Sequence, residues 1–320
     1  MTQKRILKSE HCARDGRQGP GAAPDQYRYG SLSARAGTIA RVTWLSEHTA
    51  VVTGGAQGIG LAMARRFAAA GMNLVLIDHD SEALEAATAA VAAAGRGPEG
   101  VLGVRADVTS IGDLQSVREQ ALARFGTASL LLANAGVALP KMPLWDINTA
   151  AWRWISDINI TGAMNTIATF VPGMLDLGQG HVVITSSLAG LTSGRRLGGY
   201  TITKHALVGL GKALRADLAE TGIGVSLLCP GRVPTNLTRT SARSWPDSAP
   251  RPDNLEQERH APGVTEVDAD TLADMVHDAV LAGRFWIATH PDSLADIEEG
   301  QRELAEDFAA ASLWLAGRTA

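Results

Sequence analysis

From residue 49 onward, short apolar runs alternate with longer, alanine-rich stretches in which apolar residues recur at helical spacing. Short, fully apolar runs are typical of strands buried on both faces, and such strands alternate with helices in parallel sheets. The pattern predicts strands at residues 49–53, 73–78, 100–106, 129–134, 181–186, 224–229 and 284–289. It predicts helices near residues 58–70, 81–94, 110–125, 151–175, 200–221, 268–282 and 292–311. We therefore expect a doubly wound α/β fold, with helices on both faces of a seven-stranded parallel sheet.

The segment TGGAQGIG follows directly on the first predicted strand and places Gly54, Gly58 and Gly60 at a strand-to-helix turn. A side chain at such a turn would keep the backbone away from a pyrophosphate, whose charge a helix N-terminus stabilises. Asp78 ends the second predicted strand, where a carboxylate can accept hydrogen bonds from an adenosine ribose. Each feature also has a structural interpretation: the glycines can pack a helix on a sheet, and Asp78 can cap the next helix. Together they favour a Rossmann-like fold that binds a dinucleotide.

Two segments depart from the alternating pattern. Residues 1–46 are rich in Gly, Arg, Ser and Gln and show neither apolar period, so we expect a disordered N-terminal tail. Residues 234–266 carry Pro, Ser and charge in a stretch too long for a simple connection, which is typical of a flap over a substrate. A 320-residue chain with 45% hydrophobic residues could build one large domain or two small ones. We expect a single catalytic domain at residues 47–320.

Composition excludes several classes of partner. A net charge of −4 with scattered Lys and Arg offers no basic field for nucleic acid or an anionic membrane. No apolar run is long enough for a membrane helix or a secretory signal, so we expect a cytoplasmic protein. Cys12 and Cys229 are too few for a disulfide framework or a zinc site, and Cys229 should be an inert buried thiol. No metal is expected, because His181, His205 and His290 have no ligand spacing.

The spacing of the turn, G-x-x-x-G-x-G, resembles that of the short-chain dehydrogenase/reductase family. Further segments resemble this family's motifs in the family's order: Asp107-Val108, Asn134-Ala135-Gly136, Asn159 in DINITG, Ser187 in ITSSLAG, Tyr200 and Lys204 in YTITK, and Pro230-Gly231 followed by Thr235. The resemblance covers about residues 48–290, is loose over 236–266 and does not include the tail. It implies that a nicotinamide dinucleotide is bound by Gly54, Gln57, Gly58, Ile59, Gly60, Asp78, Asp107, Val108, Asn134, Ala135, Gly136, Tyr200, Lys204, Pro230, Gly231, Val233 and Thr235.

Four residues are candidates for catalysis. Tyr200 and Lys204 are one helical turn apart on a common face, where an ammonium can stabilise a phenolate. Ser187 lies at the carboxyl end of the fifth strand, where its hydroxyl can donate to a substrate oxygen; we prefer it to Ser186 because the family's serine-to-tyrosine spacing fits it. By resemblance, Asn159 holds a water that links Lys204 to solvent. Singly, these residues could be a helix pair, a strand-end cap and a buried amide.

The expected activity is hydride transfer between nicotinamide and a secondary alcohol or ketone. NAD is favoured and NADP disfavoured, because Asp78 would repel a ribose 2′-phosphate and Gln57 stands where NADP users of the family tend to place a cation. A sugar-nucleotide epimerase is disfavoured by the glycine spacing and the short C-terminal region. A catalytically weak NAD-binding sensor or scaffold of the same fold is the alternative from another class, and the complete Ser-Tyr-Lys-Asn set argues against it.

The predicted flap and the loop before Tyr200 bear on the substrate. Trp245 in the flap is a candidate substrate contact and favours a bulky or cyclic hydrophobic alcohol. Arg195 and Arg196 could instead clamp a carboxylated alcohol, or they could be solvated or at a subunit contact. For the tryptophans of the preceding helical region we expect core packing; these are Trp145, Trp152 and Trp154.

The resemblance also implies an assembly. The helices near 151–175 and 200–221 would pair with their counterparts in a homodimer, and the last strand and helix would complete a homotetramer.

Overall fold

The computed structural model describes residues 48–256 and 265–318, so the expected tail at residues 1–46 and residues 257–264 of the flap lie outside the described residues. The seven strands of the sheet are β1 (Thr49–Thr53), β2 (Asn73–Asp78), β3 (Val101–Arg105), β4 (Ala128–Ala133), β5 (Gly180–Thr185), β6 (Ile223–Cys229) and β7 (Trp286–Ala288). They are ordered β3-β2-β1-β4-β5-β6-β7, and every neighbouring pair is parallel. The predicted fold is therefore confirmed, and the strand order reverses between β1 and β4, where doubly wound sheets bind ligands.

The helices of the described residues are α1 (Gly58–Ala69), α2 (Ser81–Ala94), α3 (Ile111–Phe125), α4 (Thr149–Ser156), α5 (Gly162–Leu177), α6 (Gly198–Asp217), α7 (Leu237–Arg243), α8 (Ala269–Leu281) and α9 (Leu294–Ala316). Side-chain caps set several starts. Asp80 accepts from the Ala83 backbone N–H at the start of α2, and Ser110 accepts from the Asp113 N–H at the start of α3.

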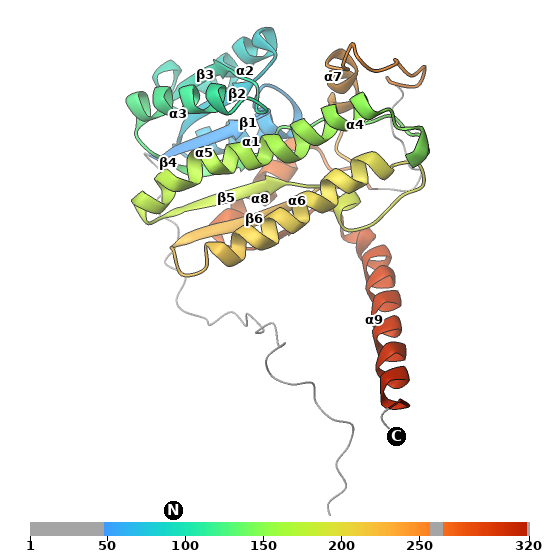
Figure 1. Ribbon diagram of the computed structural model, residues 1–320. Coiled ribbons are helices and arrows are strands. Elements are labelled where there is room, and N and C mark those ends of the chain that lie inside the picture. Colours follow the sequence, from blue (N-terminus) through green and yellow to red (C-terminus); the bar gives the residue numbers. More distant parts are fainter. Residues whose placement is uncertain (1–47, 257–264, 319–320) are drawn as a thin grey trace, which may run out of the picture. The chain divides into compact units, whose positions relative to one another are not determined.

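Two hydrophobic clusters hold the helices on opposite faces of the sheet. Val52 and Leu76 belong to the cluster shared with α1, α2 and α8, whereas Val51 and Val75 belong to the cluster shared with α3, α5 and α6. Successive side chains of a strand point to opposite faces, so a sheet covered on both sides needs continuous apolar strands. Figure 1 shows α5 and α6 in front of the sheet and α8 behind it.

The single helix predicted at residues 151–175 is interrupted. α4 is followed by a π-helical segment, η4 (Asp157–Thr161), and only then by α5. A π-helical turn has a wider hydrogen-bonded ring, and such turns occur often at functional sites. The apolar spacing on either side stays helical, which is why the sequence pattern did not reveal the interruption. Asn159 lies within η4.

The predicted flap is less irregular than its composition indicates. It contains α7. After α7 in the sequence, Trp245 and Leu255 pack with Ile155 of α4 in a third hydrophobic cluster. The prediction missed α7 because its seven residues, LTRTSAR, carry no apolar stripe. The last strand is also shorter than the predicted 284–289, because β7 pairs with β6 only from Leu227 to Cys229.

Candidate active site

The glycine turn brings the end of β1 and the start of α1 into close contact. A Cβ on Gly60 would lie 2.0 Å from the Gly54 carbonyl oxygen, so this position admits only glycine. Gly58 has φ +53°, and its Cβ would lie 3.2 Å from Thr235 Cγ2. Gln57, the residue before α1, gives the helix no side-chain cap. The first N–H groups of α1 are therefore open to an anion, and this cradle fits the pyrophosphate of a dinucleotide.

A cavity of about 560 Å³ opens at the carboxyl ends of the strands. The cofactor-binding residues expected from the sequence that line it are Gly54, Gln57, Gly58, Ile59, Asp78, Asp107, Val108, Asn134, Ala135, Gly136, Tyr200, Lys204, Pro230, Gly231, Val233 and Thr235. Gly60 does not line it, because Gly60 packs behind the turn against Gly54. Of the four candidate catalytic residues, Ser187, Tyr200 and Lys204 line the cavity, whereas Asn159 is fully buried beside it.

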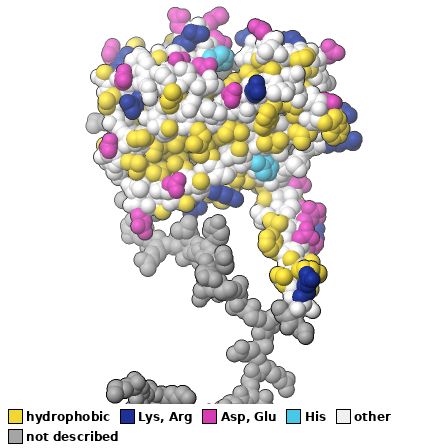
Figure 2. Space-filling view, in the orientation of Figure 1, with side chains coloured by type: hydrophobic (Ala, Val, Ile, Leu, Met, Phe, Trp, Pro, Cys, Tyr) yellow, Lys and Arg dark blue, Asp and Glu magenta, His cyan; other side chains and the backbone are white. Residues whose placement is uncertain are grey.

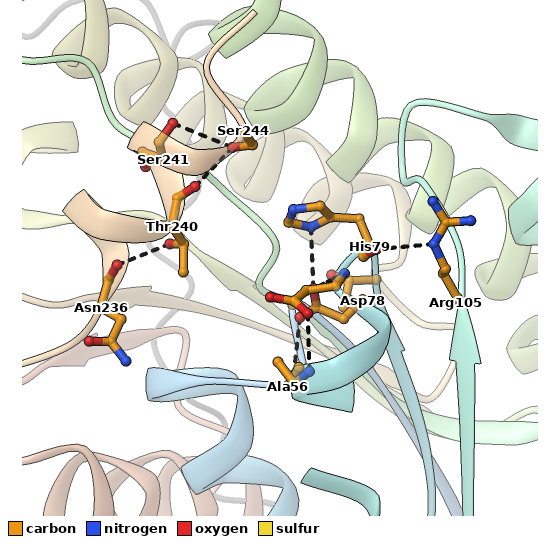
Figure 3. Close-up of polar contacts among 12 residues, drawn as sticks. Ala56, Asp78, His79, Arg105, Asn236, Thr240, Ser241 and Ser244 are labelled. Atoms are coloured by element: carbon orange, nitrogen blue, oxygen red, sulfur yellow. Dashed lines mark hydrogen bonds and ion pairs between the residues drawn. The ribbon is translucent and has the colours of Figure 1, made fainter. Parts of the chain in front are cut away.

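Asp78 anchors one end of the cavity (Figure 3). Its carboxylate accepts from the backbone N–H groups of Ala56 at 3.1 Å and Asp80 at 3.2 Å, and His79 Nδ1 lies 3.2 Å away. Burial acts to raise the pKa of Asp78, but the hydrogen bonds from His79 and the two backbone N–H groups outweigh it and lower this pKa below 3.8. The carboxylate is thus anionic at neutral pH and faces the cavity.

His79 is a cavity residue that sequence reasoning missed. Its hydrogen bond to Asp78 raises the pKa of the imidazole above 6.5. Arg105 Nε donates to the His79 carbonyl oxygen at 3.2 Å, which fixes the backbone at this point (Figure 3). The one available signal in the sequence was its position directly after Asp78.

Tyr200, Lys204 and Ser187 lie at the other end of the cavity. Lys204 is 4% exposed; its Nζ donates to the Thr185 carbonyl oxygen at 3.0 Å and lies 5.5 Å from the centre of the Tyr200 ring. Ser187 Oγ donates to the Pro230 carbonyl oxygen at 3.3 Å, whereas Ser186 Oγ is buried and donates to the Lys204 carbonyl oxygen at 2.8 Å. The hydroxyl of Ser186 is therefore engaged in packing α6 against β5.

The buried amide of Asn159 holds the loop after β4 through hydrogen bonds to its backbone. Its Oδ1 accepts from the Val137 N–H at 2.8 Å, and its Nδ2 donates to the Val137 carbonyl oxygen and to Thr203 Oγ1, each at 3.0 Å. A Cβ on Gly136 would lie 3.2 Å from Asn159 Oδ1 and 3.6 Å from Lys204 Nζ. The π-helical turn thus brings the buried amide close to Lys204.

The tryptophans correct two expectations. Trp245 does not line the cavity: it is 7% exposed, its Nε1–H donates to the Ala249 carbonyl oxygen at 3.3 Å, and its ring packs 5.4 Å from that of Trp154. Trp154 lines the cavity instead, in addition to the core packing expected for it. Trp145, expected in the core, is 86% exposed, whereas Trp152 packs against the third cluster.

The substrate end of the cavity is lined by both apolar and polar side chains. Val137, Trp154, Ile158 and Leu237 supply apolar surface. Three polar residues that the sequence prediction missed also line the cavity and follow α7 at successive turns, Asn236, Thr240 and Ser244 (Figure 3). The hydroxyls of Thr240 and Ser244 donate to backbone carbonyl oxygens of this helix, so their oxygens remain free to accept from a ligand.

Arg195 and Arg196 are exposed and do not line the cavity. The cavity lining therefore does not support the carboxylate clamp, whereas the exposure of both side chains agrees with the solvated alternative. Arg196 turns the chain in a left-handed conformation with φ 65°, and its carbonyl oxygen accepts from the Met142 N–H.

Cys229 and His181 are buried in the sheet. Burial raises the pKa of the Cys229 thiol to about 12. His181 Nε2 lies 2.7 Å from Ser226 Oγ. Within residues 48–256 and 265–318, no group of three or more His, Cys, Asp or Glu side chains could hold a metal ion. Nor does any helix there have the length and apolar character needed to cross a bilayer.

A helix N-terminus open to a pyrophosphate, an acidic group for a ribose and a Tyr-Lys pair at the same sheet edge define a dinucleotide-dependent oxidoreductase. The family model described as short chain dehydrogenase matches residues 48–245. The chain belongs to the short-chain dehydrogenase/reductase family, whose enzymes act on CH–OH groups.

Individual relatives agree with this assignment. The 1-deoxy-11-beta-hydroxypentalenate dehydrogenase of Streptomyces avermitilis is 34% identical over 272 residues, which cover 84% of this chain and 94% of the relative. The 3beta-hydroxysteroid dehydrogenase 2 of Eggerthella lenta is 34% identical over 194 residues, 60% of this chain and 74% of the relative. A short chain dehydrogenase/reductase from Burkholderia phymatum, crystallised with NAD, superimposes with a TM-score of 0.71 at 34% identity over 82% of this chain and 96% of that one.

Proposed function

We propose that this chain is an NAD-dependent dehydrogenase or ketone reductase for a bulky or cyclic hydrophobic secondary alcohol. The observation that carries the proposal is one cavity of about 560 Å³ that joins the glycine turn and Asp78 at one end to Ser187, Tyr200 and Trp154 at the other. A dinucleotide bound at the glycine turn can extend through this cavity and place its reactive end beside Tyr200 and Lys204. Nicotinamide, when bound, supplies the hydride acceptor or donor.

The side chains divide the remaining work of alcohol oxidation. Tyr200 takes the hydroxyl proton, and the Lys204 ammonium, 5.5 Å from the centre of its ring, stabilises the phenolate that results. Ser187 donates to the substrate oxygen and so orients the carbinol carbon. Asn159 holds the loop after β4, and by family resemblance it also holds a water that links Lys204 to solvent for proton relay. In the reverse direction, Tyr200 returns the proton to the carbonyl oxygen.

The preference for NAD rests on Asp78. Its carboxylate lies in the cavity, is held anionic by the low pKa described above and can accept from a ribose hydroxyl. A 2′-phosphate at the same point would meet a like charge. The NAD in the Burkholderia phymatum relative supports the same preference.

A neutral, ring-shaped alcohol fits the substrate end. Trp154, Val137 and Ile158 offer apolar surface, while Thr240 and Ser244 can accept from a second polar group of the substrate. The named activities of two relatives, toward a hydroxypentalenate and a 3beta-hydroxysteroid, support a ring-shaped alcohol; the first of these substrates is a carboxylate, so only the steroid supports a neutral one. The alternative substrate, a carboxylated alcohol, is not supported by Arg195 and Arg196, because neither residue lines the cavity.

A panel of secondary alcohols tests the proposal with NAD and NADP, read at the nicotinamide absorbance. Cyclic alcohols should turn over with NAD, and their neutral members should exceed matched carboxylated members in kcat/KM. Absence of turnover across the panel, with NAD binding retained, would favour the sensor or scaffold. Faster oxidation of the carboxylated members would overturn the substrate class.

We propose a homodimer through α5 and α6, extended to a homotetramer by the C-terminal segment, in the cytoplasm. Exposed apolar residues support the first contact, namely Met164, Leu175 and Leu177 on α5 and Ile202 on α6. No residue of α9 is buried within the chain, although Phe308 and Trp314 are large and apolar. Figure 2 shows hydrophobic side chains gathered over the α5–α6 face and along α9. Light scattering on the purified protein measures the assembly, and a monomer at micromolar concentration contradicts it.

A further inference from the structure

His290 is a buried imidazole that the mechanism above does not use. It follows β7 by two residues and is 2% exposed. Its ring lies against the loop that follows β6: Gly231 N–H donates to His290 Nδ1 at 3.0 Å, and His290 Nε2 lies 3.0 Å from the Arg232 carbonyl oxygen. One side chain therefore engages the backbone of two consecutive residues.

The partners fix the tautomer of His290. A backbone N–H can only donate, so Nδ1 carries no proton, and a carbonyl oxygen can only accept, so Nε2 carries one. The Thr289 hydroxyl, 2.7 Å from Nδ1, can donate to the same nitrogen. In this form the ring accepts from the Gly231 N–H and donates to the Arg232 carbonyl oxygen, so that one side chain satisfies a donor and an acceptor of the loop.

The ring also packs against Gly231 more tightly than any side chain at that position would permit. A Cβ on Gly231 would lie 2.7 Å from His290 Cγ and 2.7 Å from Cδ2. The glycine is thus required by the imidazole beside it. Hydrogen bonding and packing, two independent observations, both show His290 setting the position of this loop.

The loop lies at the reactive end of the cavity. Pro230, Gly231 and Val233 line it together with Ser187 and Tyr200, and the Pro230 carbonyl oxygen accepts from Ser187 Oγ. Hydride transfer at Tyr200 requires the nicotinamide ring at this end. The backbone held by His290 therefore forms part of the cavity wall at the end where a bound nicotinamide would react.

The loop that His290 contacts is also bonded to the residues at the end of the flap, Glu266 and Val267, which we call the flap stem. The Arg232 carbonyl oxygen that meets His290 also accepts from the Val267 N–H at 3.1 Å. The Arg232 guanidinium pairs with Glu266 at 3.0 Å, with Nε facing the carboxylate. His290 and the flap stem thus share one carbonyl group.

We infer that His290 is a positioning residue, which holds the Pro230–Val233 backbone under the nicotinamide ring and joins it to the flap stem. The inference rests on the proposed function, since it assigns a role relative to the nicotinamide. It makes a specific claim: loss of His290 weakens the hold on the nicotinamide half of the cofactor and leaves the adenosine half unchanged.

Comparison of NAD⁺ with ADP-ribose, which lacks the nicotinamide, tests this claim by calorimetry. His290→Phe keeps an aromatic ring and removes both hydrogen bonds to the loop, and we expect Kd for NAD⁺ to rise about tenfold. Kd for ADP-ribose should change less than about twofold, and KM for NAD should rise in parallel with Kd. His290→Asn, whose Oδ1 can still accept from Gly231 N–H, should raise Kd for NAD⁺ only about threefold. His181→Phe, the same change at another buried histidine of the sheet, is the control and should leave both affinities unchanged.

The outcomes separate the inference from the proposed function. A parent protein that binds no NAD⁺ overturns the proposed function and the inference together. A parent that binds NAD⁺, with His290 variants of unchanged affinity, overturns only the inference. Equal weakening of NAD⁺ and ADP-ribose in the His290 variants also overturns it, because that pattern reports general damage. If His290→Phe does not fold, the threefold rise in His290→Asn with constant ADP-ribose affinity decides the matter.

Discussion

Replacement of Asp78 should change which cofactor the enzyme uses. The carboxylate is 10% exposed, so water screens it little, and it is anionic at neutral pH. Two unit charges about 5 Å apart at an effective dielectric constant of about 20 to 40 repel by roughly 2–3 kcal/mol. Allowing for rearrangement of the 2′-phosphate, we expect discrimination against NADP of about 1–3 kcal/mol, which corresponds to roughly 5- to 150-fold in kcat/KM.

Two variants separate the charge from the hydrogen bonds. Asp78→Asn removes the charge and keeps one acceptor oxygen, which can accept from the N–H of Ala56 or of Asp80 but not of both, because these two groups donate to different carboxylate oxygens. The turn should therefore keep one of its two hydrogen bonds. Asp78→Ala also removes these bonds and should lose efficiency with both cofactors. The measurement is kcat/KM for NAD and NADP with one alcohol, and the ratio should move toward NADP by the factor above in Asp78→Asn.

The control is Asp80→Asn, an adjacent change at the residue that caps α2 and does not line the cavity. It should leave the cofactor ratio unchanged. A parent enzyme that uses NADP as well as NAD would refute the role given to Asp78. An unchanged ratio in Asp78→Asn would refute the electrostatic reasoning even if NAD is preferred.

Three further predictions concern the chemistry, the sheet and the N-terminal segment. Tyr200→Phe should retain less than about a tenth of the parent rate while still binding NAD, and Lys204→Ala should impair both; a smaller loss in Tyr200→Phe, below about 1.4 kcal/mol, contradicts the mechanism. Burial lowers the pKa of His181 to about 4. Since the unfolded chain binds this proton near pH 6.5, stability should be complete above that pH and fall by about 2 kcal/mol between pH 7.5 and 5. Urea unfolding should show a weaker pH dependence in His181→Asn, and an identical dependence counts against burial as the cause. A chain that begins at Thr43 should match the full chain in Tm and rate, and a marked fall in either would show that the omitted residues dock.

Close packing of backbone explains why parts of the site were predictable. The order of strands and helices follows from apolar spacing, and the glycines of the turn follow from the approach of Gly60 to Gly54. Such requirements act between residues near one another in the chain and therefore leave a local pattern. His79 gave only a weak signal, its position directly after Asp78, because a histidine after a strand is common and its contact with the Asp78 carboxylate is seen only in the structure.

The sequence by itself determined the parallel sheet, the dinucleotide turn and the four-residue spacing of Tyr200 and Lys204, since each depends on local periodicity or a local backbone requirement. The tertiary structure decided which tryptophan lines the cavity. Trp245, which follows α7, is buried in the third hydrophobic cluster, and Trp154 lines the cavity instead. The tertiary structure also showed that Arg195 and Arg196 do not line the cavity, and that His290 contacts Gly231, which is 59 residues away in the chain. These placements depend on contacts between segments that are far apart in the sequence. The spacing of residues along the chain does not show which distant segments will come into contact, so it could not predict them.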